Sequence, residues 1–335
     1  MKKWGLLGVG SLFVAGLLLL ANNHYASKSS QLKTLDKVTI ALPTQIYTGP
    51  LFIALHNKIF QQQGVEVTNQ PHELGMQGLQ AMLENKADLA VAADTPFMFK
   101  VMNGEQIAII SALSNARWAT AIVARKDRGI NNIGDLQGKK IGLSLGTNMQ
   151  FMLDILLVSH HVPEKNVQLI NLKPNQLVNA LLTGKTDAVV VWHPYLAQLQ
   201  SKMADNISLF YGADEFRFRF NLVGKKEYIA KHPDIIKKIV AALPESIDFI
   251  RQKPTAARDI IEAFIHMDTN LVTRIFNPAD FDVKLDQSLI LALDDQSRWA
   301  IKHGLVKNKH VPNYLDYIYI DALKSIQPAA VTLIH

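Results

Sequence analysis

The fold is decided by a pattern that the sequence carries twice, as residues 79–91 (LQAMLENKADLAV) and residues 178–190 (VNALLTGKTDAVV). Each copy has an apolar helical stretch, a tight turn at Asn85 or Gly184, an aspartate and an apolar strand. The copies begin 99 residues apart, a period too long for a solenoid. The repeat therefore predicts two similar α/β lobes.

The segments around each copy follow the order strand, helix, strand. Short apolar runs predict the strands, and apolar residues at helical spacing predict the helices. The predicted strands are 37–42, 65–68, 89–93, 140–143 and 167–172, and the predicted helices include 49–60 and 148–158. This order implies a mostly parallel sheet with crossover helices in each lobe.

The remainder of the chain reads as scaffold. Three further helices are predicted at 233–250, 255–265 and 286–303. The alternating residues 216–220 (FRFRF) predict a strand that returns between the lobes, from which Arg217 or Arg219 could reach a cleft.

Candidate binding residues follow from the topology, because ligands of open parallel sheets bind beyond the carboxyl ends of the strands. Polar and small residues gather in the loops predicted there, and loops facing one another across two lobes make a cleft for a small molecule. The candidates are Thr44, Gln45, Tyr47, Thr48, Asp94, Thr95, Ser111, Gly146, Thr147, Asn148, Trp192, His193 and Tyr195.

Two of these groups have a plain structural alternative. Gly146, Thr147 and Asn148 open a helix directly after a strand, which suits a bound anion but is also an ordinary helix cap. Trp192 and Tyr195 with His193 are typical of a pocket wall, although the tryptophan could instead pack between the lobes. Asp94 is equally suited to a turn or cap.

Composition narrows the function. The chain has 335 residues, 48% of them hydrophobic and 19% charged, with a net charge of +6 and no basic run of the kind that binds nucleic acid. It contains no cysteine, which excludes disulfides, thiolate metal sites and thiol nucleophiles. We expect no cofactor and no metal. His160, His161, His232, His303 and His310 are expected to be solvated rather than metal-binding.

The N-terminus predicts export. Lys2 and Lys3 precede an apolar stretch at 4–21, followed by a polar segment. This pattern describes a secretory signal ending near Ala26, but its length also approaches that of a spanning helix. Residues 1–26 are therefore either a cleaved signal peptide or a membrane anchor, and the body is expected to be periplasmic.

Several motifs together resemble the periplasmic substrate-binding proteins of ABC importers for nitrate, sulfonates, taurine and thiamine precursors. They are residues 38–67, residues 133–142 (IGDLQGKKIG) with Gly146-Thr147, and residues 181–188 (LLTGKTDA) with 192–195 (WHPY). His193 stands where the resemblance leads us to expect an acidic residue, which weakens any inference that the ligand is a cation or an amine.

The resemblance implies a two-lobed periplasmic-binding-protein fold with the ligand between the lobes. Lobe 1 is expected to comprise 37–115 and 213–335, and lobe 2 to comprise 116–212. It further implies that the chain captures a small anion or related organic molecule and delivers it to a membrane permease with its ATPase.

Three alternatives use the same lobes. One is a membrane-anchored sensor that signals to a partner. Another is an enzyme of the same fold, such as a pyrimidine-precursor synthase, although those resemble it with cysteine-containing elements. The third is a serine hydrolase, because residues 142–146 (GLSLG) match G-x-S-x-G; the helix is expected to begin after Gly146, too late for a nucleophile elbow. We expect a binding protein rather than an enzyme.

Overall fold

The structure is a computed structural model that describes residues 35–116, 119–212 and 218–334. Residue contacts group 36–335 into one compact unit. The predicted signal or anchor, residues 1–26, lies outside the described residues. Within the described ranges, no helix has both the length and the apolar character needed to cross a bilayer.

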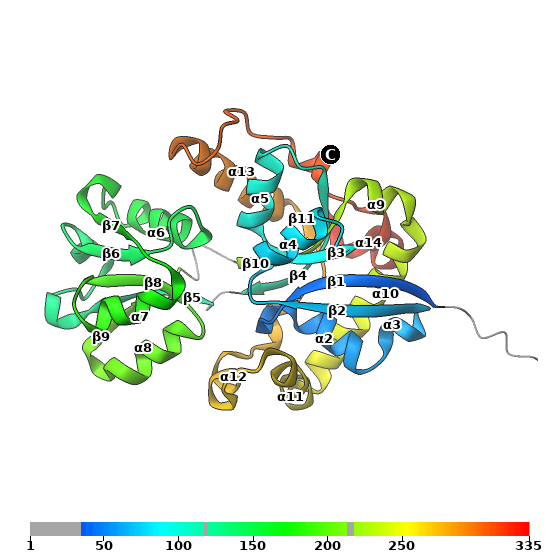
Figure 1. The fold of residues 1–335 in the computed structure, drawn as a ribbon, viewed down its shortest axis with the longest axis horizontal. Helices are drawn as coiled ribbons and strands as arrows, with labels where there is room; N and C mark the ends of the chain where they lie inside the picture. The colour runs from blue at the N-terminus through cyan, green and yellow to red at the C-terminus, as the bar shows by residue number, and fades with distance from the viewer. Residues whose placement is uncertain (1–34, 117–118, 213–217, 335) are drawn as a thin grey trace, which may run out of the picture. The chain divides into compact units, whose positions relative to one another are not determined.

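The first sheet has five strands in the order β2-β1-β3-β10-β4 (Figure 1). They are β1 (Asp36–Pro43), β2 (Val65–His72), β3 (Leu89–Ala93), β4 (Ile107–Ala116) and β10 (Phe218–Lys225). β1 pairs in parallel with β2 and β3, whereas β10 runs antiparallel to both β3 and β4. Four strands therefore share one direction, and the exception is the strand that arrives from the other sheet.

The second sheet repeats this plan in the order β7-β6-β8-β5-β9. Its strands are β5 (Thr120–Arg125), β6 (Lys140–Leu143), β7 (Gln168–Asn171), β8 (Ala188–Trp192) and β9 (Ile207–Phe210). β5, which follows directly from the first sheet, is the antiparallel strand of this sheet. The predicted pair of mostly parallel α/β sheets is confirmed. The predicted lobe limits remain a prediction, because the crossings include residues outside the described ranges.

Helices flank both sheets. With the first sheet are α2 (Gly49–His56), α3 (Ile59–Gln62), α4 (Gly75–Leu83), α5 (Asp94–Met102), α9 (Lys226–Lys231), α10 (Pro233–Gln252), α11 (Pro254–Ile265), α12 (Thr269–Ile275), α13 (Gln287–Lys302), α14 (Asp321–Ile326) and the short pair β11 (Leu285–Asp286) and β12 (Val331–Thr332). With the second are α6 (Asn148–Ser159), α7 (Pro174–Leu182) and α8 (Tyr195–Met203). The three helices expected beyond residue 230 are confirmed as α10, α11 and α13, and α10 and α11 both pack on α2.

The repeated aspartate has the same task in both sheets. The carboxylate of Asp88 accepts a hydrogen bond from the Thr39 amide at 2.7 Å, and that of Asp187 accepts one from the Lys140 amide at 2.9 Å. Each aspartate thereby ties the start of its own strand to the neighbouring parallel strand. The preceding turn uses a left-handed residue in both copies, Asn85 (φ 59°) and Gly184 (φ 72°).

Close packing places α4 directly against the first sheet. A Cβ atom on Gly75 would lie 2.9 Å from the Cα atom of Ala92 in β3. Only glycine therefore allows the first turn of α4 to approach the end of this strand so closely. The same turn also brings Met76 to the edge of the pocket described below.

Candidate functional site

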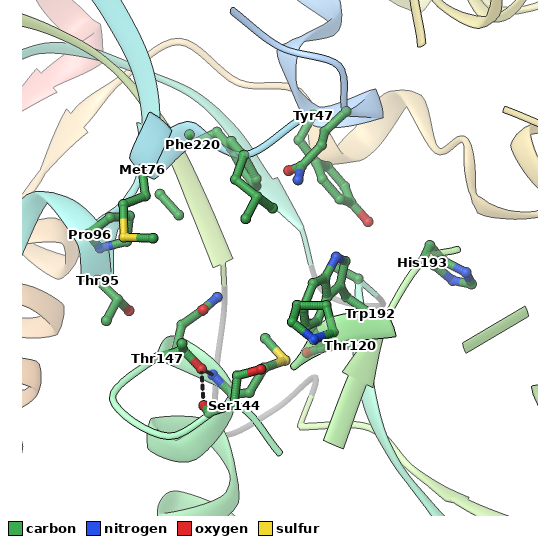
Figure 2. A pocket seen from close by; sticks show the side chains of 18 of the residues that line it. Tyr47, Met76, Thr95, Pro96, Thr120, Ser144, Thr147, Trp192, His193 and Phe220 are labelled. Carbon is green, nitrogen blue, oxygen red and sulfur yellow. Dashed lines mark hydrogen bonds between the residues drawn. The ribbon is translucent and has the colours of Figure 1, made fainter. Parts of the chain in front are cut away.

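A cavity of about 350 Å³, which we call the main pocket, is lined by loops that follow strands of both sheets (Figure 2). Tyr47 follows β1, Thr95 follows β3, Thr147 follows β6, and Trp192 and His193 lie at the end of β8. These are the carboxyl ends of parallel strands, as the sequence predicted. The volume lies near the lower end of the range for small-molecule sites.

The structure divides the predicted binding residues into three groups. Those lining the main pocket are Gln45, Tyr47, Thr95, Gly146, Thr147, Asn148, Trp192 and His193. Thr44 and Tyr195 instead line a second, neighbouring cavity, which Gln45, Trp192 and His193 also border. Thr48, Asp94 and Ser111 line neither cavity. Contact of any of them with a ligand remains a prediction.

The buried hydroxyls of Thr48 and Ser111 serve the fold. Thr48 Oγ1 donates to the Pro43 carbonyl at 2.9 Å, which closes the loop after β1. Ser111 Oγ donates to the Ala112 carbonyl at 2.7 Å. Both residues are fully buried, so these local bonds satisfy groups that would otherwise be costly to bury.

Asp94 belongs to a buried polar cluster. Its carboxylate accepts a hydrogen bond from Asn221 Nδ2 at 2.7 Å and lies 3.7 Å from a guanidinium nitrogen of Arg219. Burial raises the pKa of Asp94 to about 6, a shift that Arg219 and Asn221 partly oppose. Arg219, which the sequence left as a possible cleft residue, instead holds this carboxylate and donates to Ser288 Oγ at 2.7 Å.

The start of α6 combines an N-cap with one backbone amide, that of Asn148, that has no acceptor within the helix. Thr147 Oγ1 accepts from the Met149 amide at 3.2 Å and donates to the Ser144 carbonyl at 2.7 Å, the bond drawn in Figure 2. Gly146 precedes it with φ 70°, and its amide donates to Gln150 Oε1. The structural alternative, an N-cap, is thus present. The amide of Asn148 has no acceptor within the helix, and Asn148 is one of the residues that line the pocket.

Aromatic and sulfur-containing side chains that sequence reasoning missed form much of the pocket wall: Met76, Phe99, Met149, Phe220 and Met267. Phe220 stacks on Tyr47 with ring centroids 5.5 Å apart, and Trp192 meets Tyr195 edge-on at 5.4 Å. The alternation of phenylalanine and arginine in residues 216–220 was the one sequence signal that could have placed Phe220 in the pocket wall. Met76 and Met267 carried none, because only the folded chain brings them to the site.

His193 is an uncharged polar group in the pocket wall. Burial, reinforced by the nearby positive charge of Arg274, lowers the pKa of His193 to about 4. At neutral pH the ring is therefore neutral. Within the described residues its Nδ1 is buried and has no hydrogen-bond partner.

A cluster away from the pocket corrects the expectation for His303. Its side chain is only 12% exposed, with Nε2 3.2 Å from Asp154 Oδ2 and Nδ1 3.5 Å from Glu164 Oε1. One nitrogen of His303 and one carboxylate oxygen each of Asp154 and Glu164 lie within 4.8 Å of one another, which is close enough to hold a metal ion. The two ring nitrogens of His303 face separate carboxylates, that of Asp154 in α6 and that of Glu164.

Comparison with known proteins places the chain in a family. The sequence profile described as NMT1/THI5 like matches residues 45–257. The chain belongs to the NMT1/THI5-like family. A Bacillus subtilis protein described as an aliphatic sulfonates-binding protein is 23% identical over 317 residues, covering 92% of this chain and 94% of that protein. A binding protein of Brucella abortus is 27% identical over 172 residues, and the match spans 50% of this chain and 53% of that protein.

Solved structures share the fold. The periplasmic aliphatic sulphonate binding protein of Escherichia coli aligns with a TM-score of 0.75 at 15% identity, covering 86% of this chain and 98% of that one. The alkanesulfonate-binding protein of Xanthomonas axonopodis bound to MOPS gives 0.70 at 16%, covering 84% and 98%. The desulfurization enzyme DSZB gives 0.66 at 14%, covering 88% and 99%. The predicted periplasmic-binding-protein fold is confirmed.

Proposed function

We propose that this chain is a periplasmic solute-binding protein of an ABC importer. It captures a small organic anion of the sulfonate class in the main pocket and delivers it to a permease with its ATPase. The observation that carries the proposal is the main pocket itself, lined by the carboxyl ends of parallel strands from both sheets. Membership of the NMT1/THI5-like family and the sulfonates-binding relative in Bacillus subtilis support it.

The anionic group of the ligand is assigned to the start of α6. The N-terminal end of a helix carries partial positive charge and amides without intrahelical acceptors. Thr147 holds this turn through two hydrogen bonds, so that the start of the helix at Asn148 borders the pocket. A sulfonate oxygen placed there replaces water with fixed donors.

The contacts of Ser144 favour binding over catalysis. Ser144 Oγ donates to the Leu172 carbonyl at 2.8 Å, so its proton is directed toward the backbone. In addition, α6 begins at Asn148, which separates Ser144 from the helix start. A nucleophile elbow places the serine at the strand-to-helix turn itself, so the G-x-S-x-G match does not have the local geometry of a hydrolase.

A thermal-shift screen tests the proposal. The probes are alkanesulfonates, arylsulfonates, taurine, nitrate and pyrimidine precursors. A ligand that binds only the folded state stabilises it by about 2.7 kcal/mol at a hundredfold excess over its dissociation constant. We expect at least one sulfonate to raise the melting temperature and to be recovered chemically unchanged. Turnover of the bound probe, or no shift from any probe on folded protein, would contradict the proposal.

Thr147→Ala tests the assignment of the anionic group. Losing the cap should lower the free energy of unfolding by about 1 kcal/mol and weaken binding of the sulfonate found in the screen about tenfold, as measured by calorimetry. Thr147→Ser should restore both. The matched control is Asn277→Ala, which removes another cap, to the Ala279 amide, at a residue that lines neither cavity. If Asn277→Ala lost as much sulfonate affinity as Thr147→Ala, the loss in Thr147→Ala would be explained by lower stability alone.

A further inference from the structure

The described part of the main pocket's wall carries no formal charge. Among the described residues, none of those lining it is an aspartate, glutamate, lysine or arginine. Arg274, the cation that lowers the pKa of His193, lines the second cavity instead. Within the wall that the structure describes, an ammonium group would therefore meet no carboxylate, and an anion would meet no guanidinium or ammonium.

Three of the five hydroxyl groups among the described lining residues donate to the protein itself. Thr120 Oγ1 donates to Met152 Sδ at 2.9 Å, Ser144 Oγ to the Leu172 carbonyl, and Thr147 Oγ1 to the Ser144 carbonyl. A hydroxyl has a single proton to donate. A small hydrophilic ion would lose its hydration shell and gain no charged partner from the described wall, which is costly in a buried site.

Aromatic, thioether and aliphatic groups supply most of the remaining wall. Tyr47, Trp192 and Phe220 come from three different strand ends, and Figure 2 shows them around the same cavity as Met76 and Pro96. Such surfaces gain free energy by removing apolar ligand area from water. Methionines add a polarisable contact that adapts to aromatic rings.

We propose that the ligand of the main pocket is an organic molecule whose larger part is apolar, about the size of an aryl group or a chain of several carbons, with one polar or anionic end. The inference rests on the proposed function and specifies its substrate class. Discrimination then comes from the body of the ligand, because aromatic, thioether and aliphatic groups supply most of the described wall. Nitrate and taurine are accordingly poor ligands.

A series with a constant head group tests this. The experiment is a calorimetric titration of the protein purified after export by cells. If the exported protein remains bound to the membrane, it is studied in lipid nanodiscs without detergent. The ligands are methanesulfonate, hexane-1-sulfonate, naphthalene-2-sulfonate, taurine and nitrate. We expect naphthalene-2-sulfonate to bind at least a hundredfold more tightly than methanesulfonate, with hexane-1-sulfonate between them. Tighter binding of methanesulfonate, taurine or nitrate would overturn the substrate class and leave the proposed function standing. Binding of no probe would overturn both.

A pair of exposed apolar residues supplies a matched control. Met76 is 56% exposed and lines the pocket, whereas Leu291 is 57% exposed and lies outside it. Met76→Ala should weaken naphthalene-2-sulfonate three- to tenfold and leave methanesulfonate unchanged, and Leu291→Ala should alter neither. Because both side chains are exposed, neither variant removes buried core. An unchanged aryl affinity in Met76→Ala would count against the proposal.

Discussion

At the scale of single residues, the buried polar cluster around Asp94 shows most clearly that the type of a residue does not by itself determine its role. Asp94, Arg219 and Asn221 are all buried, and the carboxylate contacts both of the other side chains. The loop position of Asp94 in the sequence is compatible with ligand binding. Its partners lie 125 and 127 residues further along the chain, so sequence order alone does not reveal that the carboxylate is already engaged.

Asp94 makes the stability of the protein depend on pH. The pKa of Asp94 is about 6 in the folded protein and about 4 when unfolded, so the folded state binds more protons between these values. The free energy of unfolding should therefore fall as pH rises from about 4 to about 6, by up to about 3 kcal/mol from this group, and stay level above. Asp94→Asn should abolish this contribution in urea unfolding at pH 4 and pH 7.

The comparison needs a matched carboxylate. Asp205 is exposed, and Asp205→Asn should retain the pH dependence of the parent protein. The free energy of unfolding of Asp94→Asn, measured relative to the parent protein, should increase from pH 4 to pH 7. Removing a partner of Arg219 adds a cost that is the same at both pH values and does not affect this change. The same stability difference at both pH values would show that Asp94 has an ordinary pKa.

At the scale of elements, α13 and α6 are joined by a contact between distant parts of the chain. Trp299 Nε1 in α13 donates to Asp154 Oδ2 in α6 at 2.5 Å, and His303 lies beside the same oxygen. Phe151 of α6 meets the Trp299 ring edge-on at 5.3 Å. This contact ties a helix of the second sheet to one that packs on α5 of the first.

A double-mutant cycle measures this link. Trp299→Phe removes the donor and leaves a buried carboxylate with fewer partners, which should lower the free energy of unfolding by about 1–3 kcal/mol. Asp154→Asn removes the charge instead. Because the two residues share one hydrogen bond, the loss in the double variant should be smaller than the sum of the single losses. Strict additivity in urea unfolding would mean that the bond contributes nothing in solution.

At the scale of the whole molecule, loops of both sheets line the main pocket, so we expect a ligand bound there to contact both sheets at once. The main pocket takes side chains from the loop after β1 and from the start of α6. Contacts made to two lobes together are what allows a ligand to favour one conformation over another. β5 is the first strand of the second sheet and β10 the last strand of the first, and each is the antiparallel strand of its sheet.

Hydrogen exchange should report this two-sided contact. Saturation with a bound sulfonate should slow amide exchange in peptides covering both 43–52 and 144–152. Peptides covering α9, which follows the opposite end of β10, should change little beyond the global gain in stability. Protection confined to one of the two pocket segments would contradict a ligand shared between the sheets.

Local patterns in the chain were enough to predict the two α/β sheets, the strand ends whose loops line the main pocket, and the family. These depend on apolar periodicity and on the repeated turn and aspartate, where Asp88 and Asp187 bond to a neighbouring strand of the same sheet. Which polar residues face the pocket became known only from the folded chain. Thr48 and Ser111 turn inward, His303 finds two carboxylates, and Met76 and Met267 join the wall. Those outcomes depend on packing between segments far apart in the chain, which no local pattern encodes.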